Sequence, residues 1–156
     1  MMNSEISSLL DKANRLFLNK KFKESISYYD KILSKIPDNL SSLNNKGYAL
    51  SKLKNYEMAI ECYDAVLQIF PNDLSASINK ISSLRKQGNL EKALNICDEI
   101  LKNNSKYNIA LYHKERILFS LEKFDDSISC CNRILDDYPN NSDVLFDKSC
   151  NLAMLS

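Results

Sequence analysis

Residues 43–71 read LNNKGYALSKLKNYEMAIECYDAVLQIFP, and this stretch decides the fold. Its apolar and small residues recur at helical spacing in two runs, with Lys54-Asn55 as a short polar break between them. The first run contains Leu43, Gly47 and Leu50, and the second contains Tyr56, Ala59, Ile60, Tyr63 and Leu67. Pro71 cannot continue a helix and ends the second run. The stretch therefore predicts a pair of antiparallel helices.

The same pattern recurs along the whole chain with a period of 34 residues. Pro37, Pro71 and Pro139 lie on this spacing, and Ser105 occupies the slot that lacks a proline. The polar break recurs as Lys20-Lys21, Gly88-Asn89 and Glu122-Lys123. We therefore predict one domain over residues 1–156, built from repeats 6–39, 40–73, 74–107 and 108–141 and a terminal helix 142–156.

Composition agrees with a helical domain. The chain has 156 residues, enough to bury a core without metals or disulfides, and 2 glycines and 3 prolines are too few for many short strands. Its formal net charge is +1, and no segment concentrates one sign. Nucleic acid is therefore not expected as a partner, because phosphate binding needs a basic face. RNA binding by analogy with 35-residue helical hairpins is disfavoured by the 34-residue period and by the near-neutral charge.

The cysteines and the apolar runs bear on location. Five cysteines, an odd number, and an N-terminus interrupted by Glu5 and Asp11 favour a reduced, cytoplasmic compartment. No apolar run approaches the length of a membrane span, so no contact with a membrane is expected.

The motif Asn45-Lys46-Gly47-Tyr48-Ala49-Leu50, followed by residues 56–67 and Pro71, resembles the tetratricopeptide repeat. The resemblance covers nearly the whole chain and points to the prokaryotic-type Asn-Lys-Gly subclass. It implies an all-α, right-handed superhelix, and stacked hairpins of this kind line the concave groove with the first helix of each repeat. It also implies a non-catalytic protein-interaction module that binds an extended peptide or partner segment and needs no cofactor.

When the repeats are aligned, residues at the same position of each repeat form a column. Two of these columns depart from the family pattern. The position where the helices of a hairpin cross is normally small, but the column reads Ala13, Gly47, Ile81, Glu115 and Ser149. We therefore expect the third and fourth hairpins to be splayed or rotated. A column usually filled by leucine reads Lys12, Lys46, Lys80, Lys114 and Lys148, whose ammonium groups we expect to reach water.

The sixth residue of each repeat is the main candidate for contact with a peptide: Asp11, Asn45, Asn79, His113 and Asp147. An asparagine amide can bond both the C=O and the N–H of a peptide backbone, so Asn45 and Asn79 form a candidate ladder. The alternative is that both are merely solvated. Four aromatic residues also fall on or near the groove, namely Phe17, Tyr48, Tyr112 and Phe119, and the alternative for them is packing between repeats.

The family's clamp for a C-terminal carboxylate is missing. Leu10, Ser75 and Asn79 stand where its basic groups belong, although Asn14 and Asn45 match its asparagines. Arg85, Lys86 and Arg116 still give the later groove positive character, so an acidic or phosphorylated segment is an alternative ligand.

No catalytic or metal site is predicted, and the chain is not expected to be an enzyme. His113 is the only histidine, and no zinc-binding spacing occurs. Cys97 and Cys131 replace the column of Tyr29 and Tyr63 and are interpreted as small apolar fillers; a site at Cys130-Cys131 is disfavoured.

The terminal helix carries more apolar residues than one packing face needs: Val144, Leu145, Phe146, Leu152, Met154 and Leu155. We therefore expect this helix to contact a second copy, a partner or further repeats. Phe146, Leu152, Met154 and Leu155 are the candidate residues for a homodimer or another self-assembled structure.

Overall fold

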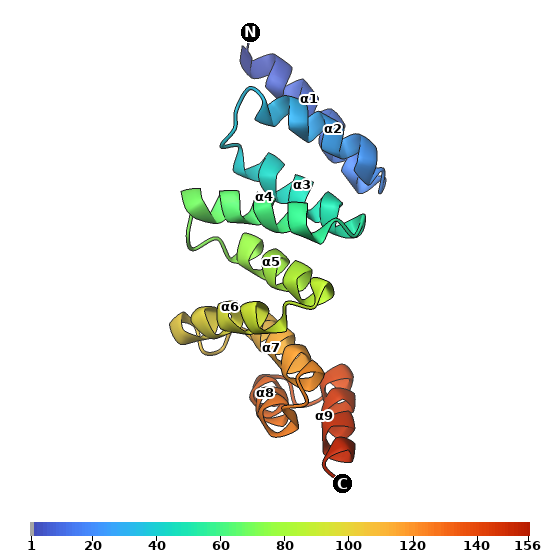
Figure 1. Cartoon of the computed structure of the whole chain (residues 1–156), viewed down its shortest axis with the longest axis vertical. Coiled ribbons are helices and arrows are strands. Elements are labelled where there is room, and N and C mark those ends of the chain that lie inside the picture. Colours follow the sequence, from blue (N-terminus) through green and yellow to red (C-terminus); the bar gives the residue numbers. More distant parts are fainter. Residues whose placement is uncertain (1) are drawn as a thin grey trace. The chain divides into compact units, whose positions relative to one another are not determined.

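The computed structural model describes residues 2–156, with side chains from residue 4 onward. Over that range the backbone forms nine helices and no strand, which confirms the all-α prediction (Figure 1). The helices are α1 (Met2–Leu18), α2 (Phe22–Leu33), α3 (Leu40–Lys52), α4 (Tyr56–Ile69), α5 (Leu74–Gln87), α6 (Leu90–Asn103), α7 (Asn108–Ser120), α8 (Phe124–Asp137) and α9 (Ser142–Met154). Four of the five first helices begin where the period places them, whereas α1 begins at Met2 instead of Ile6.

The chain divides into two compact units, residues 1–87 with α1 to α5 and residues 88–156 with α6 to α9. The boundary lies between the two helices of the third repeat. In the first unit α1 packs on α2, α2 on α3, α3 on α4 and α4 on α5. In the second unit α6 packs on α7, α7 on α8 and α8 on α9. The prediction of a single domain over 1–156 stays a prediction.

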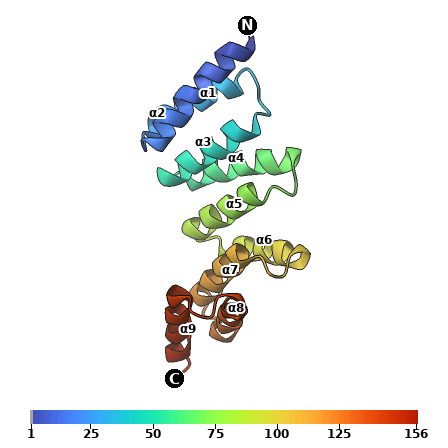
Figure 2. The same cartoon turned by 180° about the vertical axis from the view of Figure 1, so that it is seen from behind.

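Each hairpin of the first unit has its own apolar core. Ala13 of α1 lies with Tyr29 and Ile32 of α2 in one buried cluster. Leu43 and Leu50 of α3 lie with Ala59, Tyr63 and Val66 of α4 in another. Both views show the members of each hairpin side by side (Figures 1 and 2). The period that predicts the repeats is therefore the period of these buried faces.

The turns within the hairpins share one backbone conformation. Lys20, Lys54 and Glu122 have φ values of 59°, 64° and 59°, and Gly88 has a φ of 89°. The residue after each of the three non-glycine positions donates its N–H to a carbonyl near the end of the first helix, for example Asn55 to Leu50 at 2.9 Å. This bond closes the helix by a left-handed cap. The predicted polar breaks are thus the capping residues themselves.

The helix crossing explains how large residues are accommodated in the small-residue column. A Cβ added at Gly47 would lie 2.7 Å from Tyr63 Cε1, so glycine lets α3 approach the tyrosine ring on α4. In the fourth hairpin Glu115 faces a column position where tyrosine is replaced by Cys131. The Ser127 hydroxyl of α8 donates to the Glu115 carbonyl oxygen at 3.1 Å. The helices α7 and α8 of this hairpin pack on each other, with the smaller cysteine opposite the larger glutamate. The expected splaying or rotation of the third and fourth hairpins stays a prediction.

The lysine column forms ion pairs between neighbouring repeats. Lys46, Lys80 and Lys114 bond Asp30, Asp64 and Asp98, with Nζ to Oδ1 distances of 2.6, 2.5 and 2.5 Å. The three lysine side chains are 20 to 24% exposed. These ammonium groups therefore lie at a partly exposed edge, in ion pairs that the lysine column alone did not predict. Each pair joins the first helix of one repeat to the second helix of the repeat before it.

The fourth step of this series lacks its carboxylate, because Asn132 stands where the period requires an aspartate for Lys148. We expect Asn132→Asp to raise the free energy of unfolding of the second unit by about 0.3 to 1 kcal/mol, the usual range for a partly exposed pair. Urea unfolding in low salt and in 1 M NaCl measures this gain. Asn140→Asp is the control, since it adds the same charge outside the lysine column. A gain that high salt leaves intact would contradict the ion-pair explanation.

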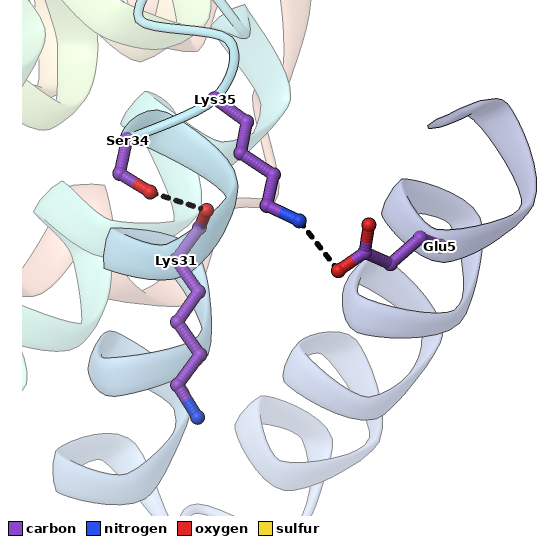
Figure 3. Close-up of polar contacts among 4 residues, drawn as sticks. All are labelled: Glu5, Lys31, Ser34 and Lys35. Carbon is purple, nitrogen blue, oxygen red and sulfur yellow. Dashed lines mark hydrogen bonds and ion pairs between the residues drawn. The ribbon is translucent and has the colours of Figure 1, made fainter. Parts of the chain in front are cut away.

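A further ion pair joins the end of α2 to the start of α1. Lys35 Nζ lies 2.5 Å from Glu5 Oε1, and the Ser34 hydroxyl donates to the Lys31 carbonyl oxygen at 2.8 Å (Figure 3). The serine bond satisfies one of the carbonyls left unpaired at the helix end. The lysine, one residue beyond the cap, is thereby placed to reach across to Glu5.

Candidate functional site

The first helices of the first unit form a continuous wall, because α1 contacts α3 and α3 contacts α5. Three direct side-chain contacts build it. Asn45 Nδ2 donates to Asn14 Oδ1 at 3.3 Å, Phe17 packs on Tyr48, and Ser83 Oγ bonds Ser51 Oγ at 3.2 Å. We call this surface the α1–α3–α5 wall, and define it by Asn14, Phe17, Asn45, Tyr48, Ser51, Asn79, Ser83 and Arg85.

A hydrogen-bonded group holds Asn45 in place. The Asn14 carbonyl oxygen accepts from Asn45 and also from the Tyr29 hydroxyl at 2.9 Å. Burial raises the pKa of Tyr29, while a hydrogen bond with Asn45 lowers it, and burial is the larger effect. The tyrosine therefore stays a neutral donor, and both asparagine amides are oriented before any ligand arrives. Sequence reasoning identified the two asparagines but missed the tyrosine, which the repeat assigns to the hairpin core.

Tyr48 combines packing with partial exposure. Its ring centroid lies 5.3 Å from that of Phe17, and Phe17 packs edge-on against Phe22 at 5.7 Å. Lys52 Nζ lies 4.9 Å from the Tyr48 centroid, as in a cation–π contact. Phe17 and Tyr48 thus pack between repeats, Phe119 packs on Phe124 within its own repeat, and Tyr48 remains half-buried on the wall.

Three other predicted residues of the first unit lie in different settings. Asn79 and Arg85 are half-buried on α5. Asp11 is exposed and lines a shallow polar hollow formed by α1 and the turn after it, together with Ser7, Lys12 and Arg15. The contacts that join Asn14 to Asn45 do not include Asp11.

Three predicted residues lie in the second unit, on α7. Arg116 lies over the Tyr112 ring, with 4.9 Å from Cζ to the centroid. Tyr112 and His113 line a hollow of about 320 Å³ between α7, α8 and the turn that follows. Its other lining residues are Asn108, Ile109, Ile134, Tyr138 and Asn141.

A buried polar cluster in the second unit escaped sequence reasoning. Glu115 is 3% exposed, and its Oε1 accepts from Ser127 Oγ at 3.1 Å and from Asn151 Nδ2 at 3.4 Å. Within the described part of the chain, Glu115 Oε2, Asp147 Oδ2 and Asn151 Oδ1 are buried acceptors without a hydrogen-bond donor. Burial raises the pKa of Glu115, and the Asp147 charge raises it further. The cluster therefore lacks donors, and a proton on Glu115 would supply one.

The cysteines behave as packing residues. Cys62, Cys97, Cys130 and Cys131 are buried thiols. Burial raises the pKa of Cys130 to about 11 and that of Cys131 to about 12, so both stay protonated at neutral pH.

Among the described residues, no group of three or more His, Cys, Asp or Glu side chains is placed to hold a metal ion. No helix in that range is long and apolar enough to cross a membrane.

The predicted apolar surface of α9 is exposed. The exposed fractions are 67% for Phe146, 50% for Leu152, 58% for Met154 and 50% for Leu155. Val144 and Asn151 are instead fully buried. The helix thus packs through one side and leaves most of its apolar residues uncovered.

Comparison with protein families gives two matches, both described as tetratricopeptide repeat, over residues 41–73 and 78–142. No curated protein sequence shows significant similarity to the chain.

Solved structures show the same fold at low sequence identity. A tetratricopeptide repeat protein from Parabacteroides merdae ATCC 43184 matches with a TM-score of 0.89 and 18% identity, covering 97% of this chain and 60% of that chain. MamA from Desulfovibrio magneticus RS-1 matches with a TM-score of 0.84 and 18% identity, covering 99% and 93%. YrrB, described as a TPR protein with an unusual peptide-binding site, matches with a TM-score of 0.77 and 16% identity, covering 93% and 75%.

Proposed function

The chain belongs to the tetratricopeptide repeat family, and we propose that it is a non-catalytic module that binds an extended segment of a partner protein along the α1–α3–α5 wall. The observation that carries this proposal is the bond between Asn14 and Asn45, which joins two neighbouring first helices. The description of YrrB as having a peptide-binding site supports the same class of function. Assignment to the Asn-Lys-Gly subclass and a cytoplasmic location stay predictions.

The asparagine pair has the chemistry that an extended backbone requires. Its two observed bonds use the Asn14 carbonyl oxygen and one N–H of Asn45. The Asn14 amide nitrogen can still donate, and the Asn45 carbonyl oxygen can still accept. A peptide offers one C=O and one N–H per residue, so it can satisfy both ends whatever its side chains are. Because the amides are already oriented, little conformational entropy is lost on binding.

The rest of the wall would select among peptides. Tyr48 supplies a half-buried aromatic surface, and Lys52 places a positive charge over the same ring. Arg85 adds a second cation on α5. An acidic or phosphorylated segment is therefore the specific alternative to a ligand read through its backbone alone. In the second unit we propose a separate contact with the partner segment, formed by His113, Tyr112 and Arg116 on α7.

Removing the two amides of the predicted ladder is the direct test. Each neutral hydrogen bond contributes about 1 kcal/mol, so Asn45→Ala with Asn79→Ala should weaken a bound peptide by about 2 kcal/mol, or roughly 30-fold. A peptide selected from a random dodecapeptide library against the wild-type chain serves as probe, and fluorescence anisotropy measures its Kd. The control is Asn55→Ala with Asn72→Ala, which removes two exposed asparagines elsewhere in the unit. Equal affinity for both double variants would contradict the ladder.

A further inference from the structure

The α7–α8 hollow is the space of about 320 Å³ between α7, α8 and the turn that follows α8. The first three repeats open with an apolar residue followed by serine, as Ile6-Ser7, Leu40-Ser41 and Leu74-Ser75. The fourth repeat reverses this order, with Asn108 first and Ile109 second, and both line the hollow. An amide thus stands where these repeats have an apolar side chain, and an apolar side chain stands where they have a hydroxyl.

The walls of the α7–α8 hollow are mostly apolar and partly open to solvent. Ile109 and Tyr138 are 51% and 56% exposed, whereas Ile134 is only 3% exposed. Tyr112 is half-buried, and Arg116 lies over its ring. A volume of about 320 Å³ is at the small end of ligand pockets, which span about 300 to 1,000 Å³. The hollow therefore suits one ring-sized side chain better than a larger ligand.

Two asparagine amides supply polar groups to this lining. Asn141 Oδ1 accepts from the Val144 backbone N–H at 3.2 Å, so the amide nitrogen of Asn141 is its remaining donor. Asn108 Oδ1 is buried and has no donor within the described part of the chain. Because no bond holds this oxygen in place, a rotation of the Asn108 amide about χ2 can turn it into the hollow. The two amides then offer one acceptor that lacks a donor and one donor.

We propose that the α7–α8 hollow binds a phenol group, the side chain of a tyrosine in the partner segment. The ring matches the apolar walls, and the hydroxyl both donates to Asn108 and accepts from Asn141. Of the three large aromatic side chains, phenylalanine offers no hydrogen bond and tryptophan only a donor, so tyrosine alone satisfies both amides. The inference rests on the proposed function in placing the phenol on a partner segment, and it names the side chain that the contact on α7 takes.

Amides of single amino acids test the hydroxyl directly. N-acetyltyrosinamide, its O-methyl ether and N-acetylphenylalaninamide are titrated into the full chain, and nitrogen–proton correlation spectra follow the backbone amides within 108–113 and 134–141. We expect saturable binding of the tyrosine amide with a Kd on the order of 1 mM, as ordinary ligand efficiencies give for so small a molecule.

The two analogues show what the hydroxyl contributes. The phenylalanine amide should bind at least about fivefold more weakly, because each neutral hydrogen bond accounts for about that factor in affinity. The O-methyl ether keeps the acceptor but lacks the donor, so it should also bind more weakly than the tyrosine amide. Equal Kd values for the three ligands would overturn the proposal.

Two substitutions on α7 separate the hydrogen bonds from the apolar walls. Asn108→Leu restores the residue type of the second and third repeats and removes the acceptor, so the ratio of the phenylalanine to the tyrosine Kd should fall toward one. Ile109→Ser should weaken both ligands alike and leave the ratio unchanged. Asn103→Ala removes an exposed amide from α6 and is the matched control, which should change neither Kd. Because the ratio compares two ligands of one variant, a general loss of stability cannot mimic the result. A ratio that Asn108→Leu leaves intact would refute the pairing of the hydroxyl with Asn108.

A peptide probe separates this inference from the proposed function. A dodecapeptide library with tyrosine fixed at a central position is selected against the Asn45→Ala, Asn79→Ala variant, so that the α1–α3–α5 wall contributes little. Adding Asn108→Leu should raise the Kd of a selected peptide about fivefold. An unchanged Kd, alongside weaker binding of the tyrosine amide, would assign the hollow to a free phenol and overturn the assignment to a partner segment. A wild-type chain that binds peptides along the wall but gives no shift with N-acetyltyrosinamide would refute the inference and leave the proposed function standing.

Discussion

The substitution Gly47→Ile is expected to destabilise the first unit by about 3 kcal/mol, the upper end of the usual effect of overpacking a core. A Cβ at this position would lie 2.7 Å from Tyr63 Cε1, 2.9 Å from Tyr63 Cζ and 3.2 Å from the Ala59 carbonyl oxygen. Tyr63 is 1% exposed and cannot move aside without displacing its neighbours. Isoleucine has a better intrinsic helix propensity than glycine, but this gain is below about 1 kcal/mol.

A second substitution should partly restore stability. Tyr63→Cys empties the space that the isoleucine needs, and the combination reproduces the residue types of the column pair Ile81 and Cys97. Alone, Tyr63→Cys should destabilise the unit by about 3 kcal/mol, because a large buried ring is lost. The double variant is nevertheless expected to be more stable than either single variant. Two residues in contact couple in this way, whereas distant ones add independently.

Urea unfolding followed by circular dichroism measures these free energies, and hydrogen exchange assigns the change to residues 1–87. Ser41→Ile is the control, because it places the same side chain at an exposed position of α3. If the two single effects simply added in the double variant, the volume compensation between Gly47 and Tyr63 would not exist.

The second large effect concerns Glu115, whose replacement by glutamine is expected to stabilise the second unit at pH 7. Glu115 Oε2 is buried without a donor beside Asp147 Oδ2 and Asn151 Oδ1, which lack donors as well. Leaving one buried acceptor unsatisfied costs about 1 to 3 kcal/mol. A glutamine side chain keeps the acceptor that Ser127 uses and adds N–H groups that can donate to these oxygens. We therefore expect a gain of at least about 1 kcal/mol.

The pH dependence gives a sharper test than the gain itself. Burial, with the Asp147 charge, raises the pKa of Glu115 above its ordinary value of 4.5, while Ser127, Asn151 and Arg116 lower it by smaller amounts. The unfolded chain then loses this proton at lower pH than the folded chain does. The stabilisation that protonated Glu115 adds to the free energy of unfolding is therefore fully present below about pH 4.5. It is lost as the pH rises through the pKa of Glu115 in the folded chain.

Glu115→Gln should remove this loss of stability with rising pH. Urea unfolding from pH 4 to pH 8, read by exchange of the amides in residues 108–154, follows it. The Asp147 carboxylate on α9 and the thiols of Cys130 and Cys131 on α8 also face the cluster. The pKa values of the two thiols, about 11 and about 12, lie well above this pH range. The exposed Glu99→Gln in the same unit is the matched control. An unchanged pH profile in Glu115→Gln would show that the carboxyl group is not the source of the dependence.

Much of the fold could be predicted from the sequence because the same helix-turn-helix pattern recurs in every repeat. The period places the first residues of α3, α5, α7 and α9, and the polar breaks mark the capping turns. The buried leucine pair Leu43 and Leu50 and its partners on α4 follow from helical spacing alone. These features depend on residues close together in the chain.

The misses depend on contacts between distant residues. The lysine column was evident, but its partners Asp30, Asp64 and Asp98 lie 16 residues earlier, on another helix. These aspartates themselves recur every 34 residues, and that spacing could have identified them as the partners of the lysines. Glu115 was read as an obstacle, because a single column does not show that the facing column has changed in the opposite direction. The bond between Asn151 and Glu115 spans 36 residues and breaks the repeat pattern, so no periodicity could reveal it.

The ion pairs of the lysine column give the stack a direction. In every pair the cation belongs to the later repeat and the anion to the earlier one, so an inverted or slipped hairpin would bring together groups of the same sign or none. The ion pairs therefore favour one orientation of each first helix on the second helix that precedes it. At the α8–α9 junction Asn132 cannot form this ion pair, and the last helix is held instead by buried Val144 and by the bond from Asn151 to Glu115.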